Sequence, residues 1–142
     1  MPLTEQPLQC VVVTPERAVL DEQAEFVALP MLDGELGVLP GRAPLVGRLG
    51  YGELRVRRGN ETKLFFIDSG FAQVRDNVVT VLTPRALRAN EIDPHSVAQK
   101  LEEAKMPALT AAAQEEHMKV QQRSRAQLRV ARHSRGESGE QL

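Results

Sequence analysis

Glycine and the aromatic residues are concentrated in the first half of this chain, and their distribution limits what each half can fold into. Eight of the ten glycines fall between Gly34 and Gly70, and residues 71–135 contain none. Because large apolar side chains supply most of a protein core, only the first half can build a substantial one. The second half must pack against another surface, since it lacks all five aromatic residues: Phe26, Tyr51, Phe65, Phe66 and Phe71.

Short apolar runs separated by turn residues predict β-strands in the first half. Pro40-Gly41 is a turn dipeptide, and residues 58–60 and 75–77 have the composition of hairpin loops. Over residues 52–57 apolar and charged side chains alternate, as in a sheet with one face in water. The sequence therefore predicts an all-β sandwich domain over residues 1–86, with strands that include residues 9–13, 25–29, 51–56, 64–67 and 78–82.

The second half, residues 87–142, changes to a helical period and predicts a helical hairpin. Asp93 followed by Pro94 is a typical helix start, and this helix should end before Pro107. Residues 108–135 contain neither glycine nor proline and predict a long second helix, capped by Thr110. We expect the polar tail that follows to fray. The second helix has a narrow apolar stripe, which cannot bury enough surface to stabilise the helix alone. The members of this stripe are mainly Leu109, Ala113, Val120, Leu128 and Ala131.

Charge is segregated within the helical half, although the whole chain has a formal net charge of only -1. Residues 89–118 carry six acids and two lysines, whereas residues 119–135 carry six bases and no acid. A basic helix of this kind suits an acidic protein surface, but a simple solvated face is an equally good interpretation. A nucleic-acid-binding module is a further alternative, supported only by this local positive charge.

The residues needed for catalysis or metal binding are absent from the predicted sandwich. Cys10 is the single cysteine and lies in an apolar run, which excludes an internal disulfide and is typical of a reducing compartment. The three histidines all lie in the helical half, and no phosphate-binding glycine loop is present. We therefore expect no enzyme activity, no metal and no cofactor, against the alternative of a small sandwich enzyme. No apolar stretch approaches the ~20 residues of a membrane span, so no direct bilayer insertion is expected.

Residues 34–45, GELGVLPGRAPL, resemble the signature of the epsilon subunit of bacterial rotary ATP synthases. The one departure is Arg42, where the family usually has histidine. Residues 68–74 and 77–82 resemble the last two sandwich strands of that family, and residues 126–130 resemble the end of its C-terminal helix. The resemblance thus covers nearly the whole chain. It implies a non-catalytic subunit of the central stalk, with a sandwich of about ten strands followed by a mobile helical hairpin.

The resemblance also implies partners and contact residues. The sandwich would bind the gamma subunit and the membrane rotor ring, transmit rotation, and hold the chain peripherally at the cytoplasmic face of the inner membrane. The family's ring contacts map onto Gly34, Glu35, Gly37, Arg42, Ala43 and Pro44. The alternative is that these six are only turn residues.

In this family the hairpin acts as a brake on ATP hydrolysis when it extends toward the alpha and beta subunits of the catalytic head. Some members also bind ATP at the start of the hairpin, through a motif of which this chain keeps Asp93. Ser96 and Val97 replace the arginine and alanine of that motif, so we expect ATP binding to be weak or absent. The brake role maps onto the basic residues Arg123, Arg125, Arg129 and Arg132.

Overall fold

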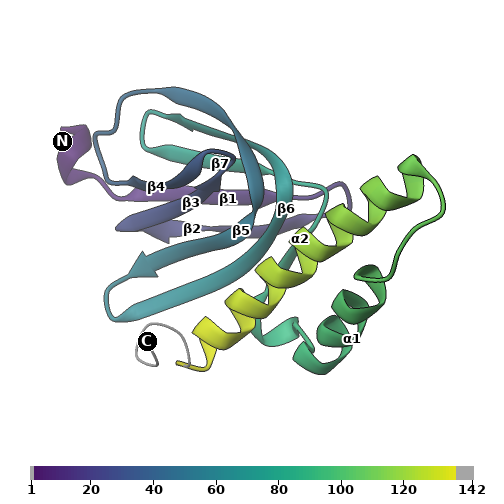
Figure 1. The fold of residues 1–142 in the computed structure, drawn as a ribbon. Coiled ribbons are helices and arrows are strands. Elements are labelled where there is room, and N and C mark those ends of the chain that lie inside the picture. The colour runs from purple at the N-terminus through teal and green to yellow at the C-terminus, as the bar shows by residue number, and fades with distance from the viewer. Residues whose placement is uncertain (1, 137–142) are drawn as a thin grey trace.

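The computed structural model describes residues 2–136, which form eight strands followed by two α-helices (Figure 1). Short 3-10 helices, Leu3–Glu5 (η1) and Ala89–Glu91 (η2), precede the first strand and the first α-helix. The strands are β1 (Leu8–Val13), β2 (Ala18–Ala24), β3 (Phe26–Met31), β4 (Gly34–Val38), β5 (Leu45–Arg58), β6 (Glu61–Arg75), β7 (Val78–Leu82) and β8 (Ala86–Arg88). The α-helices are α1 (Pro94–Ala104) and α2 (Ala111–Ser134).

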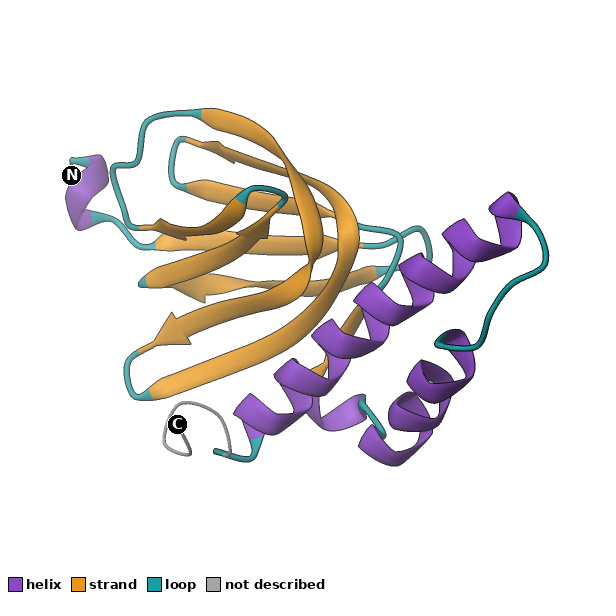
Figure 2. Cartoon of the chain, in the orientation of Figure 1, coloured by secondary structure: helices purple, strands orange, loops and turns teal. Residues whose placement is uncertain are grey.

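The strands form one mixed sheet that folds over on itself as a sandwich (Figure 2). Their order is β2-β1-β7-β6-β5-β3-β4, and β8 pairs with β6. Strands β1 and β7 are parallel, whereas β5 and β6 form a long antiparallel hairpin. The predicted sandwich is confirmed, with eight strands in the described residues rather than about ten. The number is lower because the long strand β6 counts once, although its residues 65–67 pair with β8 and its residues 71–75 pair with β7.

The long hairpin bends at its middle, and the bend requires a glycine. Pairing between β5 and β6 is interrupted between Leu49 and Tyr51. Opposite this gap, Ser69 and Gly70 adopt φ angles of 62° and 112°. A Cβ at Gly70 would lie 2.0 Å from the carbonyl oxygen of Leu82, which no side chain can tolerate. The bend turns the two halves of each strand toward different layers of the sandwich.

The interior of the sandwich is filled by large aliphatic side chains from both layers. Leu8, Leu29, Leu54 and Ile67 are fully buried there, together with the ring of Phe65. Cys10 is also buried in this cluster, where it acts as a small core residue. The sandwich therefore has a core of its own, as the distribution of large side chains predicts.

The two helices form a hairpin, and α2 packs on β5 and β6 of the sheet (Figure 1). Asp93 caps α1 by accepting a hydrogen bond from the backbone N–H of His95 at 3.1 Å. Thr110 caps α2 by accepting from the N–H of Ala113 at 3.0 Å. Both predicted caps are confirmed, and α1 ends before Pro107 as expected. The expected tail beyond residue 136 lies outside the described residues.

A second apolar cluster joins the helices to the outside of the sheet. Its buried members are Phe66, Ala89, Ile92, Val97, Ala126, Val130 and Ala131. The prediction that the helical half needs a docking surface is therefore confirmed. The predicted stripe is only partly correct: Ala131 is buried, but Leu109 precedes α2 in the connecting loop and is fully exposed.

Candidate functional site

The predicted ring-contact residues lie on β4 and on the loop that joins it to β5. Strand β4 is the last in the sheet order, so its outer edge has no neighbouring strand among the described residues. The backbone of the loop is fixed, because Gly41 N–H donates to Oδ1 of Asn77 at 2.8 Å and Asn77 Nδ2 donates to the carbonyl of Leu3 at 2.6 Å. All six predicted side chains or glycine positions are exposed on this rigid base: Gly34, Glu35, Gly37, Arg42, Ala43 and Pro44.

Glu35 and Arg42 are at opposite ends of β4. Glu35 is the second residue of the strand, beside the β3–β4 turn, whereas Arg42 lies beyond the other end, beside η1 and the β6–β7 turn. Glu35 accepts two hydrogen bonds from Arg55, with Nη1 at 2.8 Å and Nη2 at 2.9 Å. The guanidinium of Arg42 makes no ion pair within residues 2–136. Of the two predicted contact residues, Arg42 is thus available to a partner, whereas the carboxylate of Glu35 is already bound by Arg55.

An exposed apolar surface covers the outer side of β5, β6 and β7, and the sequence analysis missed it. Phe71 is paired directly with Leu82, and both side chains are about half exposed. Val46 on β5 and Val78 on β7 are exposed on the same side of the sheet, but farther along the strands, with Gln73 and Thr80 between them and the Phe71–Leu82 pair. We call these four residues the outer apolar face. The signal in the sequence was residues 78–82, VVTVL, where both alternating faces carry apolar side chains although only one can point into the sandwich.

The four predicted arginines of α2 divide into one that holds the helix and three that face solvent. Arg123 Nε lies 3.0 Å from Oδ2 of Asp68, and its guanidinium lies over the ring of Tyr51 at 5.4 Å. Arg125, Arg129 and Arg132 are exposed and form no ion pair with any described residue. The first two of these, with Arg48 from β5, line a hollow of about 530 Å³ between the helix and the bend of the sheet.

Polar contacts other than the arginine pair also hold the hairpin in place. His133 Nδ1 lies 2.7 Å from Oε2 of Glu53 on β5. Gln121 Nε2 donates to the carbonyl of Ala104 at 2.8 Å, and His117 Nδ1 lies 2.9 Å from the carbonyl of Met106. Histidines His117 and His133 therefore serve the packing of the hairpin.

At the start of the hairpin, two positions of the family's nucleotide motif are used within the fold. Asp93 is used as the cap of α1, and Val97 is buried in the cluster between helices and sheet. Ser96 cannot replace an arginine as a cation. The position that the motif gives to arginine thus carries no positive charge.

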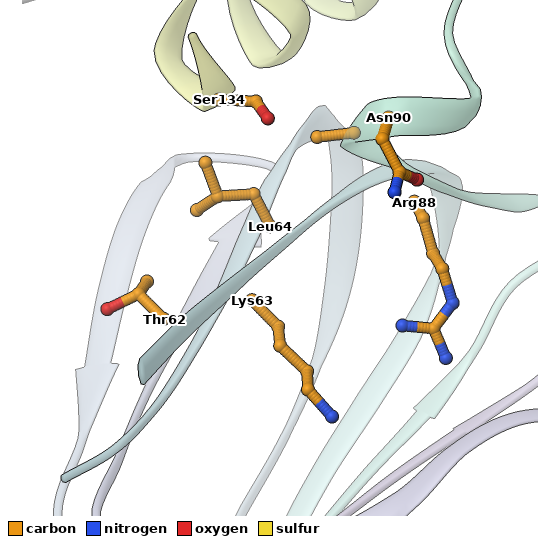
Figure 3. A pocket seen from close by; sticks show the side chains of 7 residues that line it. Thr62, Lys63, Leu64, Arg88, Asn90 and Ser134 are labelled. Atoms are coloured by element: carbon orange, nitrogen blue, oxygen red, sulfur yellow. The ribbon is translucent and has the colours of Figure 1, made fainter. Parts of the chain in front are cut away.

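A small pocket between β6, β8 and the end of α2 has a volume of about 200 Å³ (Figure 3). Lys63 and Arg88 extend away from Ser134 in this view. Lys63 pairs with Glu22 at 2.8 Å, and Arg88 lies over the ring of Phe65 at 5.3 Å. Both cations thus interact with neighbouring side chains. The residues that line the pocket include no His, Asp or Glu that could act as a base for the Ser134 hydroxyl. Among residues 2–136, no three His, Cys, Asp or Glu side chains are grouped as metal ligands would be.

None of the described helices combines the length and the apolar character that crossing a bilayer demands.

Comparisons with known proteins agree on one family. The family model "ATP synthase, Delta/Epsilon chain, beta-sandwich domain" matches residues 7–89. The ATP synthase epsilon chain of Rhodopirellula baltica is 50% identical over 126 residues, covering 88% of this chain and 98% of the relative. That of Nitratidesulfovibrio vulgaris is 36% identical over 129 residues, covering 89% and 96%.

Solved structures give the same answer. A chain of the Euglena gracilis mitochondrial ATP synthase, solved as the OSCP/F1/c-ring assembly, superposes with a TM-score of 0.79 at 27% identity, covering 84% of this chain and 78% of that one. A chain of the central stalk and c-ring of the Tetrahymena thermophila enzyme superposes with a TM-score of 0.64. At 17% identity over 90% of this chain and 98% of that one, the second match shows a shared fold.

Proposed function

The chain belongs to the family of ATP synthase epsilon chains, and from this premise we propose that it is a non-catalytic connector of the central stalk, joining the gamma subunit to the membrane rotor ring. In this proposal residues 1–86 form the rigid connector and residues 87–142 a regulatory hairpin. The chain is then held at the cytoplasmic face of the inner membrane through its partners. The observation that carries the proposal is the outer apolar face, because a rigid sandwich with an uncovered apolar surface is built to bind another protein.

The gamma subunit is the partner proposed for the outer apolar face. Phe71 and Leu82 form a cross-strand pair on this face, and aromatic anchors of this kind supply much of the binding energy of protein interfaces. Changing Phe71→Asp places a charge in that pair, and we expect co-purification with gamma to be lost. Leu109→Asp is the matched control, because Leu109 is fully exposed in the α1–α2 connection. Normal recovery of gamma with Phe71→Asp would contradict the proposal.

The rotor ring is the partner proposed for β4 and the following loop. A carboxylate and a guanidinium on a rigid backbone can form charge-assisted hydrogen bonds with polar loops. Charge reversal by Arg42→Glu should weaken binding of the gamma–epsilon complex to isolated rings, and the effect should shrink at high salt. Arg58→Glu, at the exposed end of β5, is the control. Equal losses from both substitutions would refute a specific contact at Arg42.

The hairpin is proposed to inhibit ATP hydrolysis by extending toward the alpha and beta subunits. Arg125, Arg129 and Arg132 already face solvent, so among the four arginines only Arg123 must leave a partner, Asp68, when the helix undocks. Truncation after Met106 removes the whole basic segment, and the hydrolysis rate of the reconstituted enzyme should rise. An unchanged rate would show that no brake operates in this protein.

ATP is not proposed as a ligand of the hairpin start. The residues that replace the family motif supply no cation there, and a phosphate beside Asp93 would be repelled. Titration of the full chain with ATP should therefore show no binding in the micromolar range. Micromolar affinity would overturn this expectation.

A further inference from the structure

Four charged or titratable side chains form a continuous chain of contacts from β4 to the end of α2. Glu35 on β4 is bound by Arg55 on β5, and Arg55 also lies near Glu53 two residues earlier on the same strand. Glu53 in turn holds His133 of α2. We call Glu35, Arg55, Glu53 and His133 the charge chain. It connects a proposed ring-contact residue with the helix proposed to act as a brake.

The links of the charge chain differ in strength. Arg55 binds Glu35 through two hydrogen bonds of 2.8 and 2.9 Å, the geometry in which a guanidinium matches a carboxylate best. Its Nη1 is 3.5 Å from Oε1 of Glu53, a much weaker contact. Glu53 is held more closely by His133, at 2.7 and 2.9 Å. Arg55 is therefore committed to Glu35, and Glu53 is left to His133.

The inner members of the charge chain are shielded enough for their charges to act on one another. The side chains of Glu53 and Arg55 are 16% and 29% exposed, whereas that of Glu35 is 51% exposed. The pKa of Arg55 is raised, first by its hydrogen bond to Glu35 and also by the charges of Glu35 and Glu53, against the opposing effect of burial. Glu35 is thus the member that a partner can reach, and Arg55 is the member that responds.

We propose that Arg55 is a positioning residue that couples Glu35 to the docking of α2. While Arg55 holds Glu35, Glu53 is free to bind His133 and the helix stays on the sheet. When a partner's donor takes Glu35 away, the guanidinium turns to Glu53 and competes with the imidazole for the same carboxylate. The consequence for the enzyme, that engagement of the ring loosens the hairpin, rests on the proposed ring contact; the coupling within the chain does not.

The coupling has a definite sign and a modest size. Removing the charge of Glu35 should weaken the docking of α2, although residue 35 does not touch the helix. Pairs with this degree of exposure change equilibria by roughly two- to fivefold. A larger effect would point to a structural disturbance of β4. The effect must also vanish when either Arg55 or His133 is replaced by an uncharged residue, because each is a necessary link.

The experiment is hydrogen exchange of the α2 amides over residues 126–131 in the full chain. We expect Glu35→Gln to accelerate exchange there roughly two- to fivefold, with unchanged exchange in β1 and β7. The substitution should have no effect on α2 in an Arg55→Gln background, nor in a His133→Asn background. Glu61→Gln is the matched control, since Glu61 pairs with Lys63 on β6 and has no link to α2.

Three results would overturn the proposal. Exchange in α2 that does not respond to Glu35→Gln would show that no coupling exists. A response that persists in the Arg55→Gln background would show that it bypasses Arg55. An equal response to Glu61→Gln would show a general effect of charge. The experiment uses the chain without a ring. The coupling can therefore be refuted while the proposed ring contact holds, and the ring contact can be refuted while the coupling holds.

Discussion

The molecule has two apolar interiors, and they differ in what fills them. The interior of the sandwich is packed with leucine, valine, isoleucine and phenylalanine side chains from two layers. The cluster under α2 receives from that helix only Ala126, Val130 and Ala131 as buried apolar residues. Leu128 packs against this cluster while partly buried, and polar contacts complete the attachment of α2, chiefly Arg123 to Asp68 and His133 to Glu53.

This difference indicates that the two parts are stabilised by separate interactions. The burial of a large aliphatic side chain contributes several times more than the burial of an alanine methyl group. Ion pairs that remain partly exposed contribute little and are readily exchanged for other partners. The sandwich can therefore stay folded while α2 leaves it, which is the property a releasable arm needs. The two interiors should therefore fail separately.

The largest effect is expected in the interior of the sandwich. Leu54 is fully buried between the layers, so Leu54→Ala removes apolar contacts and leaves a cavity. The free energy of unfolding should fall by about 2–5 kcal/mol, as measured by urea denaturation. Because α2 docks on the same sheet, its helical signal should be lost no later than the sheet signal. Helix signal that persists after the sheet has unfolded would contradict the dependence of α2 on the sandwich.

A smaller and local effect is expected under α2. Val130 is buried against the sheet, and Val130→Ala removes two methyl groups, worth about 1.6 kcal/mol at ~0.8 kcal/mol each. This loss of free energy should weaken only the docking of α2 on the sheet. Hydrogen exchange should accelerate in α2 and stay unchanged in β1 and β7, with a nearly constant urea midpoint for the sheet. A midpoint shift as large as that of Leu54→Ala would mean that the two interiors form one cooperative unit.

The cap of α2 should have a still more confined effect. Thr110 accepts a hydrogen bond from Ala113 N–H, and Thr110→Ala leaves that donor without its partner, at a cost of about 1 kcal/mol. We expect faster exchange in the first turn of α2 only. Thr62→Ala, at an exposed position on β6, is the control. Faster exchange at residues 126–131 in Thr110→Ala would show that the cap supports the whole helix.

Features determined by neighbouring residues were predictable from the sequence. Asp93 and Thr110 cap helices because each is followed by a free backbone N–H that its oxygen can reach. The turn at Asp76 and Asn77 was predictable too, since both residues tolerate the positive φ that they adopt. Strand β2, AVLDEQA, was missed because four of its seven residues are polar or alanine at its C-terminal end, which weakens the apolar signal.

Contacts between distant residues could not be found in the same way. His133 meets Glu53 across 80 positions, and nothing near either residue indicates the other. The outer apolar face depends on strand register, because Phe71 and Leu82 become neighbours only when β6 and β7 pair. The clamp on Glu35 likewise requires β3 to bring β4 and β5 to the same region of the sheet. These features arise from tertiary structure, and most of the candidate site consists of them.

The thiol of Cys10 reports on the interior of the sandwich only. Burial raises the pKa of this thiol from 9.0 to about 12, with further contributions from Glu22 and Asp21. The thiolate is the reactive form, so labelling at neutral pH requires opening of the sandwich. Above about pH 9 the unfolded chain releases this proton before the folded chain does, so the contribution to stability declines as the pH rises toward 12.

Thiol labelling therefore separates the two interiors without reference to helix signals. Leu54→Ala should accelerate the labelling of Cys10, because it lowers the free energy of opening the sandwich that buries the thiol. Val130→Ala should leave the rate unchanged, since undocking of α2 uncovers the outside of β5 and β6 and not the interior that contains Cys10. Faster labelling in Val130→Ala would show that α2 helps to hold the sandwich closed, and the hairpin could then not leave without loosening the connector.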